Sequence, residues 1–185
     1  MSATNSEPTI LDRYEDFRTR RFLRHEETYA NALPRWRTQH RRRMLVVGIG
    51  ASLGLMACVS VVCAFGFRQA ALLWVPATLV FFPMWLMLQI VLGRQGDAPR
   101  RTLDEFELQQ RNNARSIGLV VTQNLMLLPI GYLIIASTTM RDVDAKAALD
   151  MAYAGGLMTL AVLMIGGCLP AMILGWTRRS DELAT

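Results

Sequence analysis

Hydrophobic residues fall in four long uncharged segments, and nearly all the charge lies in the stretches between and around them. The segments at 44–67, 69–93, 116–140 and 151–177 each contain 24 to 27 residues. A helix needs about 20 apolar residues to cross the roughly 30 Å hydrocarbon core of a bilayer. The pattern therefore predicts an all-α integral membrane protein, a bundle of four transmembrane helices.

Polar segments on two sides of the first span pair carry a helical pattern of their own. In the arm at 1–43, residues 9–33 place an aromatic-rich stripe on one helix face and charges on the other. After the second span, Thr102-x-x-Glu105 is typical of a capping box, which predicts a helix at 102–115. We expect this amphipathic helix to run along the membrane interface and to bend near Gly118. A short polar tail follows at 178–185.

The segment at 103–107 also carries a family resemblance. Its letters LDEFE, followed by Arg111, Ala114 and Arg115, form an L-D-E-x-E…R-x-x-A pattern. This pattern resembles a segment that precedes a transmembrane pair in small, largely uncharacterised actinobacterial membrane proteins. The resemblance covers about 15 of the 185 residues and implies a multi-span membrane setting, without assigning functional residues. It agrees with the 19 Arg against one Lys, a ratio typical of GC-rich bacterial genomes.

Basic residues are distributed unequally between the two sides of the membrane. Seventeen of the 20 Lys and Arg residues lie before the first span, between the second and third, or after the fourth. The other two connections contain only Arg68, Arg141 and Lys146. Because basic loops stay cytoplasmic, we expect a multi-pass protein of the cytoplasmic (inner) membrane with both termini inside. The long charged arm is unlike a cleaved signal peptide, so the first span is expected to remain as an anchor.

Arginine and tryptophan residues cluster directly before the first span. Each basic residue near an anionic membrane surface is attracted by about 1 kcal/mol, so this cluster is expected to bind anionic lipids of the inner leaflet. A role in fixing orientation alone explains the cluster as well, and nucleic acid is not expected as a partner. The cluster comprises Arg35, Trp36, Arg37, Arg41, Arg42 and Arg43.

Polar and small residues inside the spans are the other candidate sites. Gln89, Thr122, Gln123 and Asn124 are expected at a similar depth, roughly 10 Å inside the cytoplasmic surface by the 1.5 Å rise per residue. They would either join helices by hydrogen bonds or line a polar vestibule for a solute. Gly50-x-x-x-Gly54 has the spacing that lets two helices approach closely, within the bundle or between two copies.

Residues for catalysis or ion coupling are missing from the expected positions. No Asp, Glu, Lys, Arg or His lies in any of the four segments, whereas proton-coupled carriers depend on such a residue. The sequence HEETY at 25–29 lacks the second His of the H-E-x-x-H zinc motif, so no metal or cofactor is expected.

We therefore expect a non-enzymatic accessory or scaffolding subunit of a bacterial membrane assembly, with a membrane-protein partner. The alternative is a small uncoupled channel or carrier that acts as a homo-oligomer. In the first hypothesis the amphipathic helices around 11–33 and 103–117 would contact the partner or the inner leaflet. In the second, the polar residues of the spans would line the path of the solute.

Overall fold

Four helical segments make up the described part of the chain. The computed structural model describes residues 38–92, 105–139 and 144–177, and no strand occurs among them. The elements are α2 (Gln39–Ala64), the 3-10 helix η2 (Arg68–Leu73), α3 (Trp74–Val91), α4 (Glu105–Thr139) and α5 (Ala145–Thr177). Four segments, with η2 and α3 counted as one, are long and apolar enough to cross a membrane. The predicted all-α fold with four spans is confirmed.

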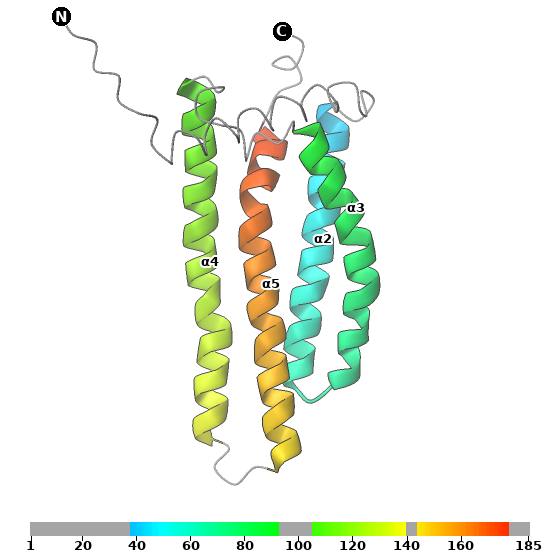
Figure 1. The fold of residues 1–185 in the computed structure, drawn as a ribbon, viewed down its shortest axis with the longest axis vertical. Helices are drawn as coiled ribbons and strands as arrows, with labels where there is room; N and C mark the ends of the chain where they lie inside the picture. Colours follow the sequence, from blue (N-terminus) through cyan, green and yellow to red (C-terminus); the bar gives the residue numbers. More distant parts are fainter. Residues whose placement is uncertain (1–37, 93–104, 140–143, 178–185) are drawn as a thin grey trace, which may run out of the picture.

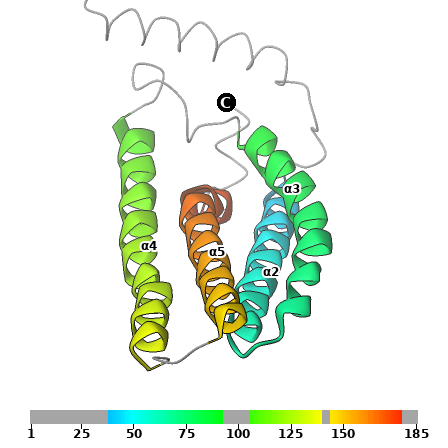
Figure 2. The same cartoon turned by 60° about the horizontal axis from the view of Figure 1, so that its bottom comes forward.

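The helices form an open row in the order α4, α5, α2, α3 (Figure 1). The helix α5 packs against both α4 and α2, and α2 also packs against α3. The second view shows the same order, with α4 at one edge (Figure 2). As a result α4 is covered mainly on the side that faces α5. Only 6% of its most hydrophobic stretch is buried, against 44% of the corresponding stretch of α2.

The helix α4 differs from the sequence prediction at its beginning. It runs unbroken from Glu105 to Thr139, so the expected bend near Gly118 is wrong, and residues 105–115 continue the span instead of forming a separate interfacial helix. One isolated glycine costs a helix only about 1 kcal/mol and does not break it. At Gly118 the missing side chain leaves room for the Pro170 ring, 3.0 Å from where a Cβ would lie. Residues 102–104 lie outside the described part.

The connection between the first two spans is as short as predicted. The helix α2 ends at Ala64, and Gly66 adopts a φ of +91°, which side chains disfavour. The Gly66 N–H donates to the Cys63 carbonyl at 3.1 Å, and η2 begins at Arg68. This turn sends α3 back along α2.

The main core lies between α2, α3 and α5. One face of α2 supplies Leu45, Ile49, Leu53 and Met56, all 3% exposed or less. Spacings of four, four and three residues keep these side chains on the same face. They meet buried residues of the two neighbouring helices, namely Phe81, Leu88, Cys168 and Leu174.

The contact between α4 and α5 depends on glycines of α5. A Cβ added to Gly166 would overlap the Thr122 side chain, and one added to Gly155 would lie 2.5 Å from Leu133. Side chains of α4 thus fit into gaps left by glycines of α5. Lipid supplies no hydrophobic driving force between helices, so close packing of this kind is the main force that holds α4 in place.

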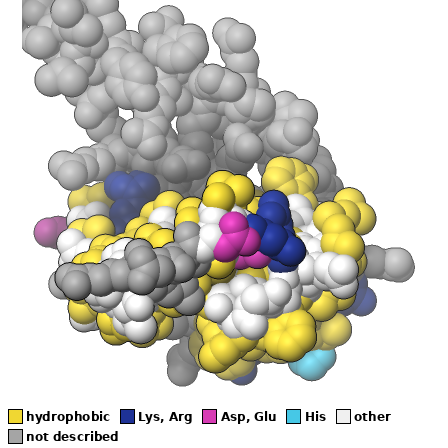
Figure 3. Space-filling model, turned by 90° about the horizontal axis from the view of Figure 1, so that it is seen from below, with side chains coloured by type: hydrophobic (Ala, Val, Ile, Leu, Met, Phe, Trp, Pro, Cys, Tyr) yellow, Lys and Arg dark blue, Asp and Glu magenta, His cyan; other side chains and the backbone are white. Residues whose placement is uncertain are grey.

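An ion pair joins the first hairpin to α5 at the end of the molecule where that hairpin turns. The Arg68 Nη1 donates to Asp150 Oδ1 at 3.1 Å, and the Arg68 guanidinium lies 5.0 Å from the centre of the Tyr153 ring. Figure 3 shows this end, where a few charged side chains lie among hydrophobic and uncharged ones. The pair helps to hold η2 against α5.

Replacing Arg68 with Gln is expected to lower the free energy of unfolding by no more than about 1 kcal/mol. The effect is small because 58% of the Arg68 side chain is exposed, which lets solvent screen the charge. Chemical unfolding of Arg68→Gln, Asp150→Asn and the double variant would measure the coupling. A loss well above this value in Arg68→Gln that Asp150→Asn does not share would contradict the pair as its source.

Candidate functional site

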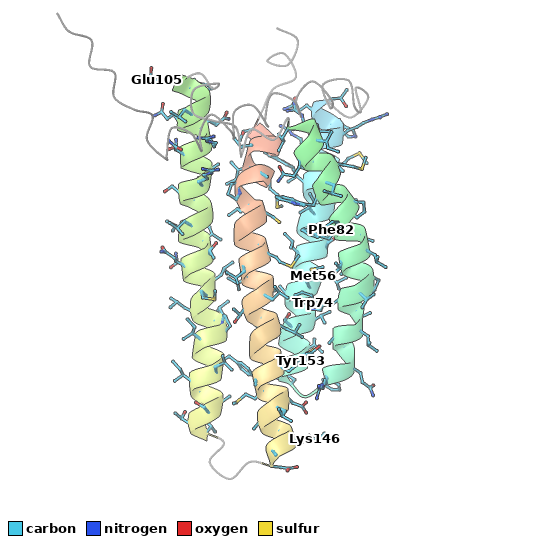
Figure 4. All side chains as sticks on the ribbon, in the orientation of Figure 1. Met56, Trp74, Phe82, Glu105, Lys146 and Tyr153 are labelled. Carbon is cyan, nitrogen blue, oxygen red and sulfur yellow. The ribbon has the colours of Figure 1, made fainter. Side chains whose placement is uncertain are left out.

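Basic side chains gather at one end of the helices, which we call the basic end. Here α2 and α4 begin and α3 and α5 end, and Glu105 is labelled there in Figure 4, opposite Lys146. Among the described residues, this end carries five arginines, and the other end carries Arg68 and Lys146. The five arginines are Arg41, Arg42, Arg43, Arg111 and Arg115. The charge bias predicted from the sequence is thus present at the two ends of the helices.

The predicted lipid-headgroup cluster does not form one exposed surface. Arg42 is fully buried, because it shares the inward face of α2 with Leu45, Val46 and Ile49. Its inclusion in an exposed cluster was therefore wrong. Arg41 is exposed, and the exposed Arg43 places its guanidinium 4.9 Å from the centre of the Trp176 ring on α5. The remaining members, Arg35, Trp36 and Arg37, lie outside the described residues.

The predicted intramembrane polar cluster is not assembled in the structure. Thr122 packs against Gly166 on the α5 side of its helix, and its hydroxyl donates to the Gly118 carbonyl at 2.6 Å. Gln123 and Asn124, the next two residues, are exposed on other sides of α4. Successive helical residues point about 100° apart, so a triplet cannot face one neighbour together.

Gln89 is also separate from the triplet. The residue before it, Leu88, lies 3.1 Å from where a Cβ on Gly175 of α5 would be, whereas Thr122 lies against Gly166, nine residues earlier in α5. By the 1.5 Å rise this is a difference of roughly 13 Å along α5. The prediction of a common depth was wrong, because the end of α3 packs beside the end of α5, whereas Thr122 meets α5 farther from that end.

The predicted Gly50–Gly54 packing motif is only partly used. A Cβ at Gly50 would meet Met172 at an ordinary 3.5 Å, while Gly54 has no neighbouring atom within 4 Å and is exposed. Close packing inside the molecule instead occurs at Gly48, against Met84, and at Gly166. The expectation of tight internal packing at Gly54 was wrong. The alternative of contact between two copies stays a prediction.

A cavity of about 240 Å³ opens at the basic end, and we call it the basic-end cavity. The helices α3 and α4 form its walls, and α5 forms its floor. The floor residues Gly167, Pro170, Ala171 and Leu174 share one face of α5, because they are three, four and seven residues apart. The lining residues are Trp85, Gln89 and Leu92 of α3, Arg111 and Arg115 of α4, and Gly167, Pro170, Ala171 and Leu174 of α5. The sequence pattern did not predict this site.

The electrostatic character of the cavity comes from the wall that α4 supplies. Arg111 and Arg115 are one helical turn apart, so both lie on the same side of α4. Arg111 is 6% exposed, whereas Arg115 is exposed to solvent. Among the residues that the structure describes, none of those lining the cavity is acidic. Two arginines, one glutamine amide and one indole therefore line the cavity together with apolar side chains.

A hydrogen bond beside the cavity ties its two flanking helices together. Gln110 Nε2 of α4 donates to Thr177 Oγ1 of α5 at 3.2 Å. The i, i+4 spacing of the two arginines was the available signal in the sequence, but it did not show which helices would face them. Groups of three or more His, Cys, Asp or Glu that could hold a metal are absent from the described residues.

Comparison with known proteins found no matching family model, no matching curated protein and no matching solved structure.

Proposed function

We propose that this protein is a non-enzymatic scaffolding subunit of a membrane assembly, and that α4 is the helix which contacts the partner. The single observation that supports this most is the position of Gln123. Its amide is exposed, and it makes no hydrogen bond to any other described residue. An amide left without a partner in hydrocarbon costs several kcal/mol, so a second helix is the natural source of one.

Gln123 lies too deep along α4 for water to supply the hydrogen-bond partner of its amide. Arg115 lies eight residues before it, roughly 12 Å along the helix axis, and Thr139 lies sixteen residues after it, roughly 24 Å. Gln123 therefore lies within the hydrocarbon layer when α4 spans the membrane. Asn124 is also exposed, but its amide donates to the Val120 carbonyl at 2.8 Å.

The surroundings of Gln123 also favour a helix as the occupant. We define the outer face of α4 as Val120, Gln123, Asn124, Leu127, Gly131 and Ile134. These positions recur at helical spacing on the side opposite Thr122, and a Cβ at Gly131 would meet no atom within 4 Å. An amide and a glycine on an apolar helix face are the features by which transmembrane helices recognise one another.

Replacing Gln123 with Leu is expected to weaken association with the partner roughly 3- to 30-fold, the equivalent of one interhelical hydrogen bond of about 0.6–2 kcal/mol. The measurement is photo-crosslinking in native membranes from a probe at Leu127, with mass spectrometry of the adduct. A probe at Leu79, equally exposed on α3, is the matched control site, with 70% against 65% exposure. Thr78→Val, which removes an exposed polar group from α3, is the control variant.

The outcomes separate the proposal from its rivals. An adduct with one distinct membrane protein from Leu127, absent from Leu79 and reduced by Gln123→Leu, supports the scaffold. An adduct with a second copy of this chain would replace the scaffold with a homo-oligomer. Equal adducts from both probes, unaffected by Gln123→Leu, would overturn the proposal.

The second candidate function, an uncoupled channel or carrier, requires a homo-oligomer. The observation that favours it is that Gln123 and Asn124 both face outward, so only several copies together could enclose them in a polar path. Purified protein in liposomes should then pass a small solute, and Asn124→Leu should slow that flux. Impermeable vesicles over a panel of ions and neutral solutes would count against this function.

A further inference from the structure

We infer that the partner of the outer face of α4 is a transmembrane helix that carries an Asn or Gln and a large apolar residue about two helical turns apart, an inference that rests on the scaffold function proposed above. The carboxamide would hydrogen-bond to Gln123, and the apolar side chain would fill the space over Gly131. Two features of α4 specify this signature: an amide that bonds to no other described residue, and a gap among exposed apolar side chains.

The chemistry of the Gln123 side chain selects the polar group of the partner. A carboxamide offers two N–H donors and an acceptor oxygen, so a second carboxamide complements both kinds of group. A hydroxyl has a single hydrogen to donate, and a charged side chain is costly at the depth where Gln123 lies. Asn or Gln on the partner is therefore expected to give the tightest contact.

Asn124 gives α4 a second polar flank at the same depth. It points about 100° away from Gln123 around the helix, and Val120 and Leu127 lie between the two directions. Its nitrogen donates to the Val120 carbonyl, whereas Gln123 makes no such bond to its own helix. A helix that lies along Val120 and Leu127 thus has a polar side chain on each side, and Gln123 is the one whose amide is available to it.

The apolar part of the surface is the Gly131 gap, which we define as the space over Gly131 among Leu127, Leu128, Ile134 and Ile135. These four residues are three or four positions from Gly131, which makes them its neighbours on the helix surface. They are 59% to 66% exposed, and a Cβ on Gly131 would meet no atom within 4 Å. A large apolar side chain of a neighbouring helix fits such a gap as a knob fits a hole.

The distance between the two features sets the spacing on the partner. Gln123 and Gly131 are eight residues apart, roughly 12 Å along the axis of α4. A helix that runs beside α4 has the same rise, so its carboxamide and its apolar side chain should be about seven or eight residues apart, on one face. Lipid chains would fill the gap but offer no hydrogen bond to Gln123, so they do not match both features.

Binding of synthetic transmembrane peptides to the full-length protein in phosphatidylcholine vesicles tests this partner chemistry. The peptides share a host helix of Leu and Ala, about 24 residues long, with Asn, Ser or Leu at the eighth position and a Leu eight positions later. Energy transfer from a donor on Lys146, the single lysine of the chain, to an acceptor on the peptide reports binding. The Asn peptide is expected to bind about 3- to 30-fold more tightly than the Leu peptide, with the Ser peptide between them.

Two variants and two matched controls assign the binding to the outer face of α4. Gln123→Leu should abolish the preference for the Asn peptide, and Gly131→Leu should weaken binding of all three peptides at least about threefold by filling the gap. Thr78→Val removes an exposed hydroxyl from α3, and Gly54→Leu puts the same side chain on a glycine of α2 that also has no atom within 4 Å. Both controls should change binding less than about twofold.

Each outcome supports or overturns the inferred partner. A preference for Asn that is lost in Gln123→Leu, together with weaker binding in Gly131→Leu and not in Gly54→Leu, supports it. Equal binding of the Asn and Leu peptides would overturn the carboxamide. A preference for Asn that persists in Gln123→Leu would overturn this face as the surface, and equal binding by the two glycine variants would overturn the Gly131 gap.

The peptides replace the native partner, so failure of the inferred chemistry is distinguishable from failure of the scaffold function. An adduct from Leu127 with a membrane protein that lacks the carboxamide would keep the scaffold and overturn the inferred signature. Equal adducts from Leu127 and Leu79 would overturn the scaffold, whatever the peptides bind.

Discussion

Gly166→Ala is expected to destabilise the protein by about 1–3 kcal/mol, the usual cost of overfilling a packed site. The added Cβ would overlap the Thr122 side chain, where α4 lies closest to α5. Because α4 packs chiefly on α5, little else can take over this contact if the two helices separate. Thermal unfolding in mild detergent, read by circular dichroism, would report the loss.

The neighbouring glycine provides a matched control. A Cβ at Gly167 meets no atom within 4 Å, so Gly167→Ala should leave stability unchanged or raise it by up to about 1 kcal/mol through better helix propensity. The double variant Gly166→Ala with Thr122→Ala should recover part of the loss, since Thr122 supplies the atoms that the new Cβ meets. Equal stability of the two single glycine variants would refute the Thr122–Gly166 contact.

Leu53→Ala is expected to cost about 2–5 kcal/mol if the core does not collapse around the missing atoms, with the lower end favoured in lipid. Leu53 is 3% exposed and packs in the core between α2, α3 and α5. In a membrane the transfer term largely disappears, because the surrounding solvent is as apolar as the core. What remains is the cavity left behind and the dispersion attraction that the removed atoms had provided.

Leu55 is the matched control for Leu53, because it is the same residue type on the same helix. It is 46% exposed on the opposite side of α2, the side that we expect to face lipid. Leu55→Ala should therefore change the free energy of unfolding by less than about 0.5 kcal/mol, as is usual for surface substitutions. Denaturant unfolding of both variants measures the difference, and similar losses would mean that Leu55 is covered by another helix in the protein as purified.

The number of spans and the short turn between the first two were predictable from the distribution of apolar and charged residues along the chain. The four spans depend on the length of each uncharged segment, because the bilayer sets a minimum length and penalises charge within it. The short turn at Gly66 followed from the single basic residue between the first two segments. The helices extend beyond the predicted spans, as α5 begins at Ala145 and not at 151, because residues flanking a membrane can continue a helix into water.

The buried face of each span was not predictable in the same way. In water, a helix shows its buried face as an apolar stripe, but a spanning helix is apolar on all sides because lipid covers what protein does not. The beginning of α4 illustrates this: the apolar Phe106 and Ile117 are 69% and 49% exposed, while the charged Arg111 is buried.

The sequence by itself determined that the chain forms four helices long and apolar enough to cross a membrane, and that most basic residues of the described part lie at one end of them, since hydrophobic length and charge act locally. Tertiary structure alone decided which small residues bring helices together, Gly166 and not Gly54, and which polar residues share a site. It brought Gln89 to Arg111 and Arg115, and left Gln123 on the outer face of α4. These outcomes depend on how the helices pack, and that packing depends on side chains that are far apart in the chain.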